Sequence, residues 1–232
     1  MSLVCDCRSI ETCQCVDGDP TKLQGDATDQ KDATSLLPKS SMFYARLLRK
    51  IAFSRMFLGY LFRRHDVVLE MATKVKVHLA ESKFYPTLDL LLEKFYLGLT
   101  AYSIVRRGGV GNNTAEWQAI GDALTNEMKD LSENDSKWNF EQKYYLLEAE
   151  KAFTDGDVEA AATAYDKAIE AAKEHRFINE QALARERAAL FYLEHGNIGQ
   201  ARRYMEKSRD LYDAWGAKRK VEDIGNWIGS IE

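Results

Sequence analysis

Two stretches of this sequence follow one layout, and this repetition is the strongest constraint on what the chain can fold into. Residues 149–175 and 188–217 both place small and aromatic residues at regular offsets around a glycine. The two glycines, Gly156 and Gly196, are 40 residues apart. Similarity at a fixed period indicates a repeat protein, in which copies of one unit stack and bury a continuous core.

The offsets in both stretches suit pairs of antiparallel helices. Small residues stand where two helices would approach closely, and aromatic residues stand where the next pair would pack; Met205 and Ser208 take the places of Tyr165 and Ala168 in the second stretch. This layout resembles the tetratricopeptide repeat, with a period of 40 in place of the usual ~34 residues. We assign packing between repeats to Ala149, Gly156, Ala161, Tyr165, Ala168, Ala189, Tyr192, Gly196, Ala201, Tyr204 and Trp215.

The remainder of residues 39–232 also favours helices. Ala, Leu, Glu and Lys dominate from residue 42 onward, and no stretch alternates apolar and polar residues as a strand would. The first predicted helices span 42–64, 67–81, 86–106 and 114–131. The next begins at an Asn139 cap and runs to about residue 154, and three more begin at the caps Asp157, Asn179 and Asn197. After Gly216, which is expected to end a helix, the last helix spans 220–228. We therefore expect an all-α, tetratricopeptide-like α-solenoid of antiparallel helix pairs, with eight or nine helices.

Residues 1–38 have no apolar periodicity, and their composition predicts a disordered, flexible N-terminal leader. All four cysteines lie in it, as Cys5, Cys7, Cys13 and Cys15. Zinc sites usually use two intervening residues between paired cysteines, whereas these pairs have one. The sequence therefore favours a flexible tail whose cysteines have no specific role. Metal binding, redox pairing and lipid attachment are the alternatives. We expect no cofactor.

The charge balance and the N-terminus bear on partners and location. There are 32 basic and 36 acidic residues, a net charge of −4, which gives no general attraction for nucleic acid. The first residues lack the basic and apolar regions of a secretory signal. We therefore predict a cytoplasmic protein that does not bind nucleic acid.

The sequence lacks the common signatures of catalysis. The glycines at 108, 109 and 111 are followed by Asn-Asn-Thr, without the lysine of a phosphate-binding loop. The histidines His65, His78, His175 and His195 are scattered, and no nucleophile-elbow or kinase motif occurs. We expect that the protein is not an enzyme.

Residues 42–64 form a basic segment without an acidic residue. It contains Arg46, Arg49, Lys50, Arg55, Arg63 and Arg64. Such a segment could contact membranes or acidic partners, or it could be the first helix of the domain with its arginines in solvent. The second interpretation is favoured because the segment leads directly into further helices, so membrane contact is the less favoured alternative.

The aromatic residues of the second half allow two interpretations. At helical spacing they usually form the core between repeats, but some would also line a groove for an extended peptide or a helix. They are Tyr144, Tyr145, Tyr165, Phe191, Tyr192, Tyr204, Tyr212 and Trp215.

Residues 84–224 also resemble the helical region of large multidomain signalling proteins, which join a serine/threonine kinase-like domain and an AAA-type predicted ATPase to an α-solenoid. Those proteins often continue into GAF and histidine kinase domains. The matching residues are Tyr165, Asp166, Ala168, Ile169, Glu174, Phe177, Ile178, Ala182, Leu183, Glu186, Phe191, Tyr192, Leu193, Gly196, Tyr204, Tyr212, Trp215, Gly216, Ala217, Lys220 and Val221. The printed residues contain no kinase motif and no phosphate-binding loop. We therefore predict a non-catalytic protein–protein interaction module in intracellular signalling. The alternatives are a regulatory fragment of such an ATPase or kinase protein, and a peripheral membrane adaptor using residues 42–64.

Overall fold

The computed structural model describes residues 42–81, 87–108 and 113–231, together with Asp19, Thr21 and Pro38. Within these residues the chain forms nine helices and no strand, so the prediction of an all-α protein is confirmed. The predicted leader and its four cysteines lie outside the described residues, apart from the three isolated positions.

The chain divides into two compact units, Met1–Thr100 and Ala101–Glu232. In the first unit, α2 (Met42–Leu61) and α3 (His65–Glu81) pack against each other as a helical hairpin. Arg63 makes the turn between them with a φ of 57°. The first part of α4 (Leu88–Arg106) completes this unit, and its Tyr96 ring lies 4.7 Å from that of Phe57 on α2.

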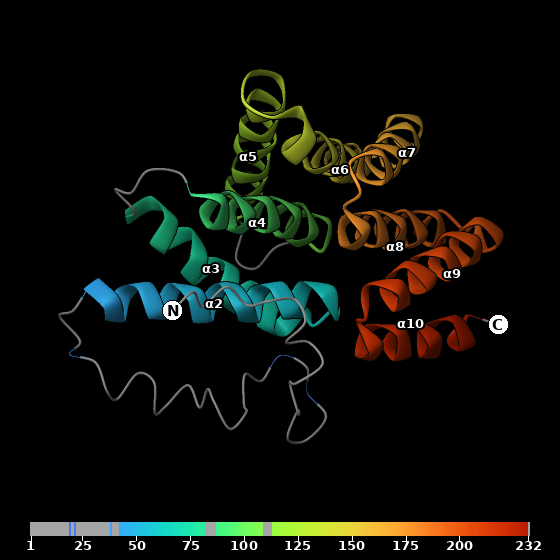
Figure 1. Ribbon diagram of the computed structural model, residues 1–232, viewed down its shortest axis with the longest axis horizontal. Helices are drawn as coiled ribbons and strands as arrows, with labels where there is room; N and C mark the ends of the chain where they lie inside the picture. The colour runs from blue at the N-terminus through green and yellow to red at the C-terminus, as the bar shows by residue number, and fades with distance from the viewer. Residues whose placement is uncertain are drawn as a thin grey trace. The chain divides into compact units, whose positions relative to one another are not determined.

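The second unit contains the end of α4 and six further helices. The pairs α6/α7 and α8/α9 are close-packed hairpins, α5 packs on α6, and α10 packs on α9. Figure 1 shows α6 to α10 following one another as neighbouring helices, coloured from yellow to red. Their bounds are α5 Thr114–Asn134, α6 Lys137–Asp155, α7 Val158–Glu174, α8 Ile178–Glu194, α9 Ile198–Trp215 and α10 Lys218–Ser230.

The predicted signals at several helix ends are confirmed. Gly156 and Gly216 end α6 and α9 in the left-handed conformation, with φ of 80° and 91°, which suits glycine because it has no Cβ. At the start of α7, the Asp157 side chain accepts a hydrogen bond of 3.0 Å from the Ala160 amide. At the start of α9, the Asn197 side chain accepts one of 3.1 Å from the Gln200 amide.

Two predicted caps are wrong. Helix α6 begins at Lys137, two residues before Asn139, and the Asn139 side chain donates a hydrogen bond to Ser136 Oγ from inside the helix. Helix α8 begins before Asn179, with Phe177 at the cap position. Arg176 has a φ of 62° and turns the chain sharply after α7, so the next helix starts sooner than the asparagine signal indicated.

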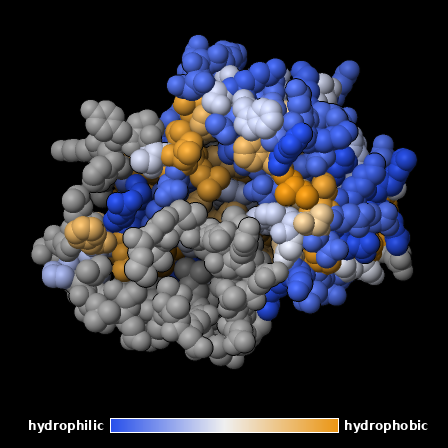
Figure 2. All heavy atoms as spheres, in the orientation of Figure 1, coloured by the Kyte–Doolittle hydropathy of each residue, from blue (hydrophilic) through white to orange (hydrophobic). Residues whose placement is uncertain are grey.

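The C-terminal helix covers the last hairpin. Met205, Tyr212, Ile224 and Ile228 belong to one buried apolar cluster, and Trp227 packs against it while partly exposed. Trp227 and Ile228 therefore close the apolar end of the last pair. On the face seen in Figure 2, hydrophilic residues cover most of the second unit and hydrophobic residues form small patches.

Candidate interaction surface

A buried carboxylate in the second unit, that of Glu150 on α6, joins this helix to three others. Its two oxygens accept hydrogen bonds from Arg187 on α8, at 2.8 and 3.0 Å, and from Arg106 on α4. Tyr165 on α7 donates a further hydrogen bond of 2.7 Å. The Glu150 side chain has no exposed surface. Every one of these contacts is charge-assisted, which makes them shorter and stronger than neutral hydrogen bonds.

The charges around Glu150 set its protonation state. Burial alone would raise the pKa of this carboxyl, but the guanidinium groups of Arg187 and Arg106 outweigh that effect and lower the pKa from 4.5 to about 2. Glu150 is therefore ionised at neutral pH. Burial and the adjacent carboxylate raise the pKa of Tyr165, which keeps its hydroxyl protonated as a donor.

Two more buried ion pairs join the same series of helices. Lys220 on α10, which is 2% exposed, lies 2.8 Å from Glu186 on α8. Lys143 on α6 lies 2.7 Å from Glu180 on α8. Together with Glu150 and its arginines, these inter-helix ion pairs link α4, α6, α8 and α10. Separation of one of these pairs would leave an uncompensated buried charge. The ion pairs therefore disfavour other alignments of the helices, in which the charges would not meet.

The residues assigned to packing between repeats fall into three groups, one of which is the two exposed turn glycines, Gly156 and Gly196. Those with at most 1% exposure are Ala149, Ala161, Tyr165, Ala168, Ala189 and Ala201. Tyr192 and Tyr204 are half-buried, with ring centroids 5.2 Å apart, and the Tyr204 hydroxyl donates a 2.6 Å hydrogen bond to Asp166 on α7. Trp215 is half-buried against the apolar cluster that contains Tyr212.

The other aromatic residues differ in the same way. Phe191 and Tyr212 are 1% exposed and belong to the interior. Tyr144 and Tyr145 are half-buried, and their ring centroids are 5.2 Å apart on the outer side of α6. The two interpretations of these aromatics therefore apply to different residues: Tyr165, Phe191 and Tyr212 form the core, whereas Tyr144 and Tyr145 stay partly exposed on α6.

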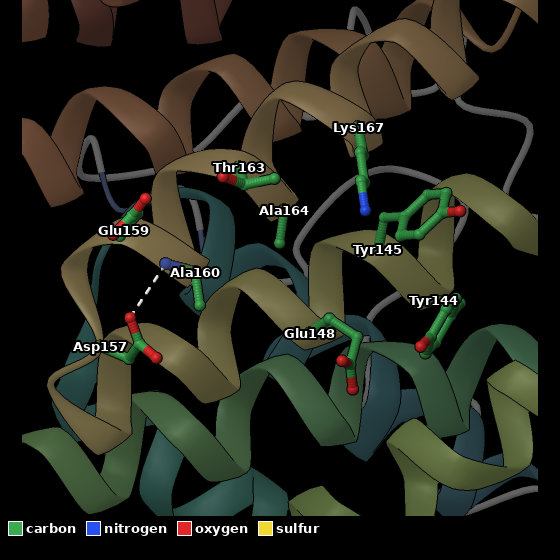
Figure 3. Close-up of a pocket in the computed structure, with 9 residues that line it drawn as sticks. All are labelled: Tyr144, Tyr145, Glu148, Asp157, Glu159, Ala160, Thr163, Ala164 and Lys167. Atoms are coloured by element: carbon green, nitrogen blue, oxygen red, sulfur yellow. Dashed lines mark hydrogen bonds between the residues drawn. The ribbon is translucent and has the colours of Figure 1, made fainter.

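Tyr144 and Tyr145 line an open groove of about 460 Å³ between α6 and α7. Figure 3 shows Lys167 of α7 pointing toward the ring of Tyr145, and its ammonium lies 5.5 Å from the ring centroid. The other residues of this lining are Glu148 from α6 and Asp157, Glu159, Ala160, Thr163 and Ala164 from α7 or its cap.

The residues of the basic segment are placed as follows. Arg49 and Lys50 form ion pairs with Glu93, at 3.5 and 3.0 Å, and the Glu93 side chain is fully buried. Arg64 lies 3.3 Å from Asp66. Arg46 is exposed, and Arg55 and Arg63 are half-buried. The arginines and the lysine of this segment are thus not gathered on one exposed face.

Histidine and acidic side chains do not gather into a metal site in the part of the chain that the structure describes. His175 is buried, with Nδ1 3.1 Å from the Gln142 amide oxygen, whereas His195 Nδ1 lies 2.8 Å from the Phe191 carbonyl oxygen. His65 and His78 stand at the two ends of α3. None of the helices described here is sufficiently long and apolar to span a bilayer.

No known family model matches this sequence, and no curated protein is significantly similar to it. The resemblance to tetratricopeptide repeats and to multidomain signalling proteins therefore stays a prediction.

Sequence reasoning missed the inter-helix ion pairs. Glu150 and Arg187 were visible only as charged residues within predicted helices, at LEAEK (147–151) and ARERA (184–188). Charged residues are almost never fully buried unless paired, so such positions are the one available signal. The partner of each charge depends on how the helices pack, which the sequence pattern does not give.

Proposed function

We propose that this chain is a non-catalytic protein–protein interaction module, built as a tetratricopeptide-like α-solenoid, that binds a segment of a partner protein in the cytoplasm. The support for a solenoid is the succession of two hairpins and a covering helix, α6 to α10, each packed on its neighbour. Gly156, Gly196 and Gly216 all have positive φ at the ends of consecutive hairpin elements. Stacked helix pairs offer extended surfaces for binding.

The observation that carries the proposal is the groove between α6 and α7. Its accessible rings, Tyr144 and Tyr145, project from a helix whose opposite side is fixed by the Glu150 ion pairs. Tyrosine supplies a large contact area at a low cost in conformational entropy, because it has only two side-chain torsions. A rigid helix that presents two such rings beside a groove loses little freedom on binding.

The test is a selection from a random peptide library against the full chain, followed by binding measurements on two matched variants. Thr163→Trp places a large ring in the groove, and Thr73→Trp places the same ring at an exposed site on α3. We expect selected peptides to lose at least about tenfold in affinity for Thr163→Trp, since the groove would be filled, and to bind Thr73→Trp as they bind the natural chain. Peptides that bind both variants equally would contradict the proposal.

A second candidate is a regulatory segment of a multidomain ATPase or kinase signalling protein. Its support is that two residues of that resemblance, Glu186 and Lys220, form the buried ion pair between α8 and α10. An antibody against residues 140–220, followed by mass spectrometry of the captured band, tests it. A band near 26.5 kDa would contradict this candidate, and a much larger band that contains kinase or ATPase sequence would support it.

A further inference from the structure

We propose that the α6–α7 groove takes an extended, lysine- and arginine-rich segment of the partner protein. The inference rests on the proposed function, since it names the chemical class of the ligand for the same groove. Three features of the described residues lead to it: the length of the groove, the charge of its lining, and the position of its aromatic rings.

The groove is long enough for a peptide of several residues. A second depression along the same hairpin is lined by Lys137, Glu141, Tyr145, Lys167, Glu170, Ala171 and Glu174. It shares Tyr145 and Lys167 with the first depression, so the two depressions adjoin along the α6–α7 hairpin, and the name groove covers both from here on. The lining on the α7 side runs from Asp157 to Glu174, which corresponds to about 25 Å of helix. An extended peptide of about seven or eight residues spans that length.

The lining carries far more negative than positive charge. Its acidic residues are Glu141, Glu148, Asp157, Glu159, Glu170 and Glu174, and its basic residues are Lys137 and Lys167. Lys137 lies 3.4 Å from Glu141, so one of the two lysines is already paired inside the groove. Within the described residues, Glu148 and Glu159 accept no hydrogen bond and form no salt bridge. Charge complementarity at interfaces fixes the choice of partner and speeds encounter, and here it selects a basic segment.

The aromatic rings can hold the cationic side chains of such a segment. Tyr145 already has the Lys167 ammonium 5.5 Å from its centroid, which shows that a cation fits beside this ring. Tyr144 lies next to it, and burial together with the Glu148 carboxylate raises the pKa of its hydroxyl. A guanidinium placed between Tyr144 and Glu148 would meet a ring face and a carboxylate together. An acidic peptide or a phosphate backbone would instead meet the carboxylates of this lining and be repelled.

Fluorescence anisotropy with the full chain tests the proposal, using three labelled twelve-residue probes of identical spacing. The basic probe alternates Arg or Lys with Ala and Ser; the acidic and neutral probes carry Glu or Gln at the charged positions. The groove variant is Glu148→Gln with Glu159→Gln. The matched control, Asp213→Asn with Glu222→Gln, removes the same net charge from exposed positions on α9 and α10.

We expect the basic probe to bind, and its affinity to fall about five- to tenfold in the groove variant, because exposed charge pairs contribute modestly. The control variant should bind it as the natural chain does, Thr163→Trp should abolish binding, and added salt should weaken it. Equal binding to the groove and control variants would overturn the inference.

Other occupants of the groove would give distinct results. Library peptides that need the groove but contain no Lys or Arg would overturn this inference while leaving the proposed function in place. Self-association of the chain that Thr163→Trp abolishes would assign the groove to a second copy, and would also overturn it. Failure of every probe and every library peptide to depend on Thr163 would overturn both proposals.

Discussion

Replacement of Glu150 by glutamine should destabilise the second unit by about 3 kcal/mol at neutral pH. The substitution keeps the size of the side chain but removes the charge that Arg106 and Arg187 face in the interior. The folded state lowers the pKa of this carboxyl from 4.5 to about 2. Because each tenfold change in an acid dissociation constant corresponds to about 1.4 kcal/mol, this difference amounts to about 3 kcal/mol. It agrees with the ~3–5 kcal/mol cost of breaking a buried ion pair.

The same ion pairs predict how stability depends on pH. Since folding lowers the pKa of Glu150, its contribution is fully present above about pH 4.5 and is lost as the pH falls toward 2. Urea denaturation of the natural chain and of Glu150→Gln, at pH 7 and at pH 3, measures both effects. We expect the difference between the two chains to be large at pH 7 and to shrink at pH 3.

A matched control separates the buried charge from a general effect of the substitution. Glu148→Gln makes the same change on α6, two residues away and at a half-buried position. It should alter the free energy of unfolding by less than about 1 kcal/mol, as surface substitutions usually do. If Glu150→Gln and Glu148→Gln were equally stable at pH 7, the inter-helix ion pairs would not stabilise the alignment of these helices.

Three further predictions concern the helix ends and the packing. Gly156→Ala should destabilise the chain by about 1 kcal/mol, because φ is +80° at this position, although a Cβ would meet no atom within 4 Å. Gly225→Ala, inside α10, should stabilise the chain by a similar amount. Thermal melting of both variants checks this, and equal melting temperatures would contradict it. Ala201→Trp should destabilise the chain by about 3 kcal/mol, because Ala201 has no exposed surface and the ring would overpack the interior. The control Ala214→Trp, at an exposed position, should be nearly neutral. An unchanged melting temperature for Ala201→Trp would contradict the close packing of helices at Ala201. Lys220→Met should cost about 3 kcal/mol by leaving Glu186 buried without its lysine, and a urea midpoint equal to that of the natural chain would contradict this.

The helical class and most helix ends could be predicted because they depend on local interactions. The left-handed ends at Gly156 and Gly216 and the caps Asp157 and Asn197 all act within one turn of the chain. Asn179 carried the same signal but was wrong, because the turn at Arg176 already starts α8 before it. A local signal thus fails where a neighbouring turn determines the start of the next helix.

The roles of individual aromatic residues could not be predicted, since all of them share the same helical spacing. Tyr165 and Tyr212 became interior donors to buried carboxylates, whereas Tyr145 remained accessible beside Lys167. The difference depends on which side of each helix the next helix covers. The candidate groove was therefore foreseen only as a possibility for some of these residues.

The sequence by itself determined that residues from 42 onward form helices, where most of those helices end, and that small residues recur at fixed offsets. Helix propensity, capping and periodicity act between residues that are close along the chain. Only the tertiary structure decided that Glu150 meets Arg106 and Arg187, and that carboxylates from α6 and α7 line one groove. It also decided that the Tyr102 ring packs against Gly121, where a Cβ would lie only 2.8 Å from the ring. These contacts join side chains from different helices, and their positions follow from packing, which no local pattern encodes.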